Sequence, residues 1–132
     1  MQTTILITGA NGQLGNELRI ALQAYPSLSP IFTDVNDMDI TSPDEVDAFF
    51  NQHHPHFVVN CAAFTAVDAA EDQPDLCRRI NAEAVEILAK AAKRYQAKMI
   101  HVSTDYVFSG DACEPYTEDI PTSPRSVYGD RK

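Results

Sequence analysis

Short apolar runs alternate along the chain with longer stretches in which apolar residues repeat at helical spacing. The runs interpreted as strands occupy residues 5–8, 30–34, a very short segment at 37–40, 57–63 and 98–103. The helical stretches begin near Glu17, at Pro43 and near Pro74, and the last continues to about Tyr95. This alternation predicts an α/β fold: a Rossmann-type parallel sheet of about five strands in the order 3-2-1-4-5, with helices on both faces.

Two of the helices carry clear signals of their ends and faces. Ser42 is suited to the N-cap of the second helix, Pro43 to its first position, and acids follow in its first turn. We expect its buried face to consist of Val46, Phe49 and Phe50. In the last helix we expect a core stripe of Leu76, Ile80, Ala84, Ile87, Leu88, Ala91 and Ala92, opposite a solvated face of Glu83, Glu86, Lys90, Lys93 and Arg94.

Three glycines, Gly9, Gly12 and Gly15, lie between the first strand and the first helix. Their spacing is G-x-x-G-x-x-G. Glycine lets the backbone approach a phosphate, and the open N–H groups of a helix N-terminus favour an anion. The position of the motif therefore predicts a pyrophosphate-binding loop, and a plain structural turn is the alternative.

Asp34 ends the second strand, 19 residues after Gly15. A dinucleotide-binding fold places there the carboxylate that binds the ribose 2′-hydroxyl. Asp34 would repel a 2′-phosphate, and no arginine stands beside it in the sequence, so NADH is favoured over NADPH. A solvated turn aspartate is the alternative. Asp39 and Ile40 follow at the expected adenine site, where a base contact and a purely structural role are equally plausible.

The ends of two later strands carry residues suited to a ligand site. Ala62 and Ala63 are small enough for a ligand to lie against the backbone, and Thr104 and Asp105 offer a hydroxyl and a carboxylate. Tyr128 and Lys132 are four residues apart, on one face of a helix. A lysine beside a tyrosine lowers the pKa of the phenol, which suits it to proton transfer, and Thr104 could share the bond to a carbonyl oxygen.

Composition narrows the possible partners. The chain has 132 residues and a formal net charge of −9, which argues against a nucleic acid or an anionic membrane as partner. It contains no apolar run long enough to span a membrane, and its three cysteines are widely spaced, so we expect reduced thiols and a cytoplasmic protein. His53-His54-Pro55-His56 lacks the further ligands of a metal site, so we predict a surface loop and no metal.

Four motifs in order make the chain resemble the dTDP-4-dehydrorhamnose reductase family of the extended short-chain dehydrogenase/reductase superfamily. They are Thr8-Gly9-Ala10-Asn11-Gly12-Gln13-Leu14-Gly15, Asn60-Cys61-Ala62-Ala63-Phe64-Thr65-Ala66-Val67-Asp68, Ser103-Thr104-Asp105-Tyr106-Val107-Phe108 and Val127-Tyr128-Gly129. The resemblance implies reduction of the C4 ketone of dTDP-4-dehydro-L-rhamnose, a nucleotide sugar, by NADH or NADPH. Family members are described as magnesium-dependent dimers, which implies Mg²⁺ and a homodimer for the full-length protein.

The resemblance also implies roles for individual residues. Tyr128 would be the general acid, Lys132 its partner, Thr104 the hydroxyl that orients the ketone, and Asp105 a substrate contact. The cofactor would be held by Gly9, Asn11, Gly12, Gln13, Leu14, Asp34, Asp39, Ile40, Ala62, Ala63, Phe64, Thr65, Tyr128 and Lys132.

Members of the family are more than twice as long as this chain. We therefore expect residues 1–132 to be an incomplete NAD(P)-binding Rossmann domain without the C-terminal substrate-binding part, and inactive by themselves. Two other functions stay open. One is a non-catalytic regulatory subunit of the kind that partners methionine adenosyltransferase, and the other is a nucleotide-sugar epimerase or dehydratase.

Overall fold

A computed structural model describes residues 2–62, 75 and 78–102 of the chain. Its centre is a sheet of four parallel strands, β1 (Thr3–Thr8), β2 (Leu28–Phe32), β3 (Phe57–Asn60) and β4 (Lys98–His101). Their order is β2-β1-β3-β4. This is the predicted order without the short strand at 37–40, so the Rossmann-type parallel sheet is confirmed.

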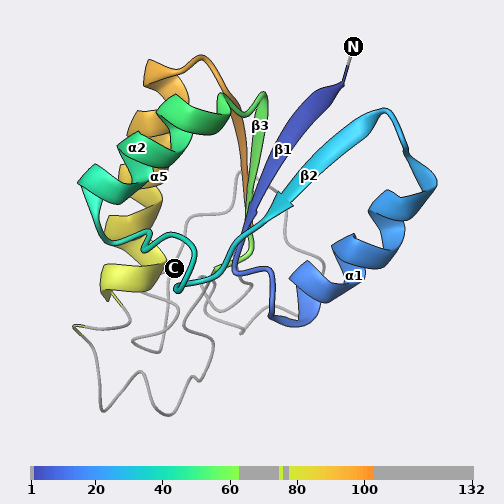
Figure 1. Ribbon diagram of the computed structural model, residues 1–132. Helices are drawn as coiled ribbons and strands as arrows, with labels where there is room; N and C mark the ends of the chain where they lie inside the picture. Colours follow the sequence, from blue (N-terminus) through green and yellow to red (C-terminus); the bar gives the residue numbers. More distant parts are fainter. Residues whose placement is uncertain (1, 63–74, 76–77, 103–132) are drawn as a thin grey trace, which may run out of the picture.

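Helices cover both faces of this sheet (Figure 1). Helix α1 (Gln13–Ala21), continued by the 3₁₀ turn η1 (Leu22–Ala24), lies on one face, and α2 (Pro43–His53) and α5 (Ala84–Arg94) lie together on the other. Right-handed crossovers explain the arrangement. The chain moves one way across the sheet from β1 to β2 and the opposite way from β3 to β4, so the connecting helices fall on opposite faces.

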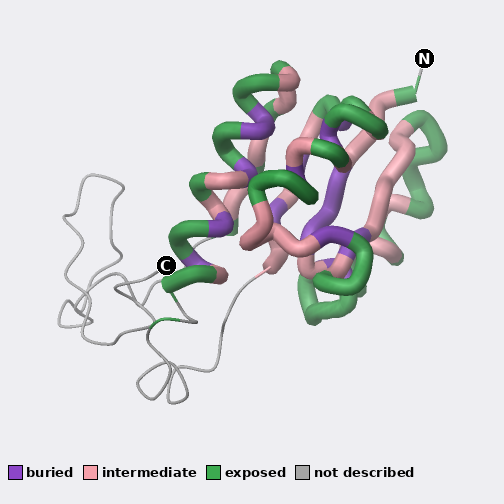
Figure 2. Tube along the Cα trace, turned by 60° about the vertical axis from the view of Figure 1, so that its left-hand side comes forward, coloured by how far each residue is buried: buried purple, intermediate pink, exposed green. Residues whose placement is uncertain are grey.

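The main hydrophobic core lies between the sheet and the pair α2–α5. Leu6 of β1 and Val58 of β3 are fully buried there, against residues of both helices. The members of this cluster are Leu6, Met38, Val46, Phe50, Val58, Leu88, Ala91 and Ala92. Figure 2 shows the same pattern, with buried segments at the centre of the sheet and on the inner side of α5. By contrast α1 packs loosely, since Leu14 and Ile20 are 42% and 65% exposed.

The predicted start of α2 is confirmed. The Ser42 hydroxyl accepts a hydrogen bond from the backbone N–H of Glu45 at 3.4 Å, and Pro43 occupies the first turn. Val46 and Phe50 are buried, and Phe49 is half-buried. The first helix begins four residues earlier than predicted, at Gln13, because Gly12 is extended and its carbonyl already accepts from the N–H of Asn16.

The prediction of a strand at 37–40 is wrong, because short-range hydrogen bonds fold this segment into turns. The backbone N–H groups of Asp37 and Met38 both donate to the carbonyl of Asp34. The Asp37 carboxylate in turn accepts from the N–H of Asp34 at 2.9 Å. Aspartate side chains compete in this way with a strand for the backbone groups.

The last helix contains a π-helical turn, η2 (Arg79–Glu83), that the sequence pattern did not predict. From Ala84 onward the prediction is confirmed: Ala84, Leu88, Ala91 and Ala92 are buried, and the charged face is exposed. Glu86 and Lys90 form an ion pair at 2.9 Å on that face. Leu76 lies outside the described residues.

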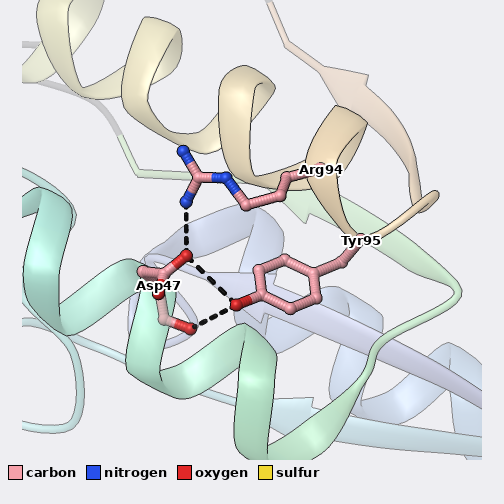
Figure 3. A network of polar contacts seen from close by, with 3 residues as sticks. All are labelled: Asp47, Arg94 and Tyr95. Atoms are coloured by element: carbon pink, nitrogen blue, oxygen red, sulfur yellow. Dashed lines mark hydrogen bonds and ion pairs between the residues drawn. The ribbon is translucent and has the colours of Figure 1, made fainter.

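A polar network ties α5 to α2 at the end of the core (Figure 3). The Arg94 guanidinium donates to the Asp47 carboxylate, and the Tyr95 hydroxyl lies 3.1 Å from the same oxygen and 3.4 Å from the Asp47 carbonyl. Burial and the bond to Asp47 raise the pKa of Tyr95. The network fixes the spacing of the two helices above Phe50, whose ring centroid is 5.9 Å from that of Tyr95.

We expect Phe50→Ala to lower the free energy of unfolding by about 3–5 kcal/mol, because it opens a cavity in a fully buried site. Denaturant titration measures this loss. Phe49→Ala is the matched control on the same helix, where the half-buried ring stacks on His53 with centroids 4.3 Å apart. Equal losses for the two variants would contradict the assignment of Phe50 to the core.

Candidate functional site

A cavity of about 430 Å³ opens at the carboxyl ends of β1, β2 and β3. The chain leaves β1 for β2 on one side and later returns to β3 on the other, so the cavity lies at the point where strand order reverses. Ligands bind at such points in open α/β sheets. The lining residues are Thr8, Gly9, Gly12, Thr33, Asp34, Val35, Met38, Asp39, Ile40, Thr41, Cys61, Ala62, Arg79 and Ile80.

Glycine is needed at each of the three loop positions for a different physical reason. Gly9 has φ +62°, and a Cβ there would lie 2.5 Å from the backbone nitrogen of Ala62. A Cβ on Gly15 would lie 2.4 Å from the carbonyl oxygen of Ala10, so that glycine lets α1 pack on the loop. A Cβ on Gly12 would meet only the Gly9 carbonyl oxygen, at 3.4 Å, among the described residues. Gly12 therefore keeps space open on the cavity side.

The first turn of α1 follows this loop with its N–H groups uncapped by a side chain. Such a terminus and an open glycine cradle fit a pyrophosphate group. The predicted residues Gln13 and Leu14 are in this first turn, beside the cavity and not in its lining. Asn11 also flanks it: its side-chain oxygen accepts from Arg19 at 3.2 Å, and the Arg19 guanidinium lies 4.4 Å from the centre of the Phe32 ring.

Two predicted acids, Asp34 and Asp39, line the cavity together with Ile40. One carboxylate oxygen of Asp34 accepts from the N–H of Val35 at 2.8 Å, which fixes the side chain at the end of β2. Asp39 accepts from the Thr41 hydroxyl at 2.6 Å and from its N–H at 2.9 Å. These bonds, with a contribution from the positive charge of Arg79, lower the pKa of Asp39. Both side chains thus offer hydrogen-bond acceptor oxygens at the cavity.

Arg79 is a lining residue that sequence reasoning missed. It lies far from Asp34 in the sequence, and the fold brings it to the same cavity. A signal was available: Arg19 is the sole lysine or arginine before Arg78, so Arg78 and Arg79 interrupt a long region poor in positive charge. Thr8, Thr33, Val35, Met38, Thr41, Cys61 and Ile80 were also not predicted as lining residues, whereas the predicted Ala62 is among them.

A buried polar network underlies the cavity and joins three strand ends. The Asn60 side-chain oxygen accepts from the Thr8 hydroxyl at 2.6 Å and from the N–H of Ala62 at 3.2 Å. Its amide nitrogen is 3.3 Å from Nδ1 of His101. Asn60 and Thr8 are both 1% exposed. The network therefore holds the ends of β1, β3 and β4 in register where the cavity begins.

Other predicted site residues lie outside the described residues: Ala63, Phe64, Thr65, Thr104, Asp105, Tyr128 and Lys132. Within the described part of the chain, no group of three or more His, Cys, Asp or Glu side chains could hold a metal ion. In the histidine segment, Nδ1 of His56 accepts from the N–H of Thr4 at 3.0 Å, and His54 ends α2 with φ 45°. No helix among the described residues combines the length and hydropathy of a membrane span.

We expect Asn60→Leu to lower the free energy of unfolding by about 1–3 kcal/mol, because it leaves the buried Thr8 hydroxyl and the Ala62 N–H without their acceptor. Asn16→Ala, which removes an exposed 3.3 Å bond to Asn11, is the control and should change stability by less than about 0.5 kcal/mol. Denaturant titration compares the two. If Asn60→Leu lowers the free energy of unfolding no more than Asn16→Ala does, the buried network of Asn60 does not stabilise the fold.

Two curated relatives are similar to nearly the whole of this chain. A relative from Streptomyces antibioticus, named a probable dTDP-4,6-dihydroxy-2-methyloxan-3-one 4-ketoreductase, is 46% identical over 96% of this chain and 43% of its own length. The dTDP-4-dehydrorhamnose reductase of Burkholderia thailandensis is 43% identical over 97% of the chain and 42% of its own length. The chain thus spans less than half the length of these curated relatives.

A solved structure gives the same result for the fold. The dTDP-4-dehydrorhamnose reductase of Bacillus anthracis, in complex with NADP, matches with a TM-score of 0.96 and 38% identity, over 99% of this chain and 46% of that one. The resemblance inferred from the four motifs is confirmed. The family model of the RmlD substrate binding domain matches residues 3–132, and the chain belongs to that family.

Proposed function

We propose that the protein carrying this chain is an NAD(P)H-dependent dTDP-4-dehydrorhamnose reductase, which reduces the C4 ketone of dTDP-4-dehydro-L-rhamnose to dTDP-L-rhamnose. The observation that carries the proposal is the cavity at the reversal of strand order, with an open glycine loop on one side and Asp34 on the other. The names of the relatives from Burkholderia thailandensis and Streptomyces antibioticus, both reductases of dTDP-linked ketones, support the reaction class.

The described residues would hold the cofactor by its phosphates and its adenosine. The backbone around Gly12 and the first turn of α1 would bind the pyrophosphate, since the turn is uncapped by a side chain. Asp34 would accept a hydrogen bond from the ribose 2′-hydroxyl, which favours NADH. Asp39 and Ile40 would flank the adenine, and Ala62, Ala63, Phe64 and Thr65 would line the path to the nicotinamide ring.

The bound nicotinamide supplies the hydride, and the protein supplies the proton and the orientation. Tyr128 would donate its hydroxyl proton to the ketone oxygen as that oxygen gains charge. Lys132 would stabilise the resulting phenolate, and Thr104 would orient the ketone by a second hydrogen bond. Asp105 would contact the sugar. From the family resemblance we also propose Mg²⁺, a homodimer and a cytoplasmic location for the full-length protein.

We expect Gly12→Ala to abolish detectable cofactor binding while the fold survives. Gly12 has φ −80°, which alanine tolerates, and its Cβ would occupy the cradle without a backbone clash. Gly9→Ala is the matched comparison: its positive φ and the 2.5 Å approach to Ala62 should unfold the protein. Circular dichroism and NADH titration separate the two outcomes. Normal NADH affinity in a folded Gly12→Ala protein would argue against a phosphate cradle.

We expect the full-length protein to oxidise NADH or NADPH when offered dTDP-4-dehydrorhamnose, and Tyr128→Phe to lower kcat by about 10²–10⁴-fold because the proton donor is lost. Absorbance at the nicotinamide band follows the reaction. Cofactor binding without turnover would favour the non-catalytic regulatory subunit. Turnover by a pure chain of residues 1–132 would contradict the expectation that this part is inactive alone.

A further inference from the structure

We propose that Arg79 lets this pocket accept the 2′-phosphate of NADPH, so that Asp34 and Arg79 together set the choice between the two cofactors. The inference rests on the proposed function, because it concerns the same cavity. It assigns a specificity role to a residue outside the glycine loop and outside the strand ends.

The charges that line the cavity carry the argument. Among its described lining residues, Asp34 and Asp39 are acidic and Arg79 is the one basic residue. A 2′-phosphate adds nearly two negative charges beside the ribose, where two carboxylates would repel it. A guanidinium offers a planar fork of donors that matches a phosphate. Arg79 is therefore the described lining residue able to offset that repulsion.

The position of Arg79 within the cavity also fits this role. Arg79 lines the same cavity as Asp34 and Asp39, and its positive charge contributes to the lowered pKa of Asp39. The acids there are already engaged by local donors, Asp34 by the N–H of Val35 and Asp39 by Thr41. Arg79 itself is exposed, so its guanidinium is accessible to a ligand entering from solvent.

The π-helical turn explains how a helix that packs on the sheet can also supply this arginine. The N–H of Ala84 donates to the carbonyl of Arg79, five residues back instead of four. The extra residue rotates the side chains before Ala84 by about 100° around the helix axis, relative to the buried stripe that starts at Ala84. Arg79 and Ile80 thereby both line the cavity, while Asn81 is buried.

The other described arginines near the site are engaged elsewhere. Arg19 bonds to Asn11 and lies over the Phe32 ring, and it is not a lining residue. Arg78, the neighbour of Arg79, pairs with Glu83 at 3.3 Å and is also not a lining residue. Arg78 therefore provides a matched control with the same charge change at the next position in the chain.

The test is equilibrium binding of NADH and of NADPH to the full-length protein, measured by calorimetry. We expect Arg79→Gln to raise the Kd of NADPH by about tenfold or more, because a charge-assisted bond is lost, and that of NADH by less than about twofold. We expect Arg78→Gln to change both constants by less than about twofold. The same variants are also titrated with adenosine 2′,5′-bisphosphate and with adenosine 5′-monophosphate, which differ only by the 2′-phosphate. We expect Arg79→Gln to raise the Kd of the bisphosphate and to leave that of the monophosphate nearly unchanged.

The outcomes separate this inference from the proposed function. Selective loss of NADPH and of the bisphosphate in Arg79→Gln supports it. Equal weakening of both cofactors, no change, or the same loss in Arg78→Gln overturns the role of Arg79 and leaves the reductase proposal intact. Failure of the unchanged protein to bind either cofactor overturns the proposed function and this inference with it. Circular dichroism of each variant confirms that the fold is kept, as expected for exposed side chains.

Discussion

Gly9, just after β1, lies directly against the backbone of Ala62, just after β3. A Cβ on Gly9 would lie 2.5 Å from the backbone nitrogen of Ala62 and 2.7 Å from the carbonyl carbon of Cys61, and the positive φ of Gly9 independently excludes most residues. The approach brings the two central strands together at their ends before the chain turns away on either side. The cavity opens where the two strands diverge. The buried hydrogen bonds of Asn60 lie below it and hold the ends of β1, β3 and β4 side by side.

Around that contact the molecule divides its tasks between the two faces of the sheet. The face covered by α2 and α5 carries the large buried residues and the Asp47–Arg94–Tyr95 network, so it supplies rigidity. The helix on the other face, α1, is loosely packed. Its contribution to the site is its N-terminus, which is uncapped by a side chain and lies beside the cavity. The large buried residues thus lie under α2 and α5, whereas the uncapped N-terminus at the cavity belongs to α1.

The sequence allowed the architecture and the glycine loop to be predicted because both depend on local spacing. The apolar runs, the Ser42 cap and the buried stripe of α5 are short-range patterns, and the structure confirms them. Local patterns failed at residues 37–40. There the hydrogen bonds of Asp34 and Asp37 form turns in place of a strand, and Met38 is buried although it belongs to no strand. Arg79 was missed because its nearness to Asp39 arises from a helix packed across the sheet, and the π turn that directs it has no recognisable spacing. The assignments of Thr104, Tyr128 and Lys132 stay predictions.

The π turn has a consequence for how this site can diverge between related proteins. Substitution of a contacting side chain is one route to a change of cofactor preference. Here, deletion of one residue from 80–83 would restore ordinary helical pairing and rotate Arg79 by about 100° relative to the packed stripe that begins at Ala84. The charge of the pocket could then be removed by a change in chain length alone. A deletion and a substitution are, at this one turn, interchangeable routes to a different ligand.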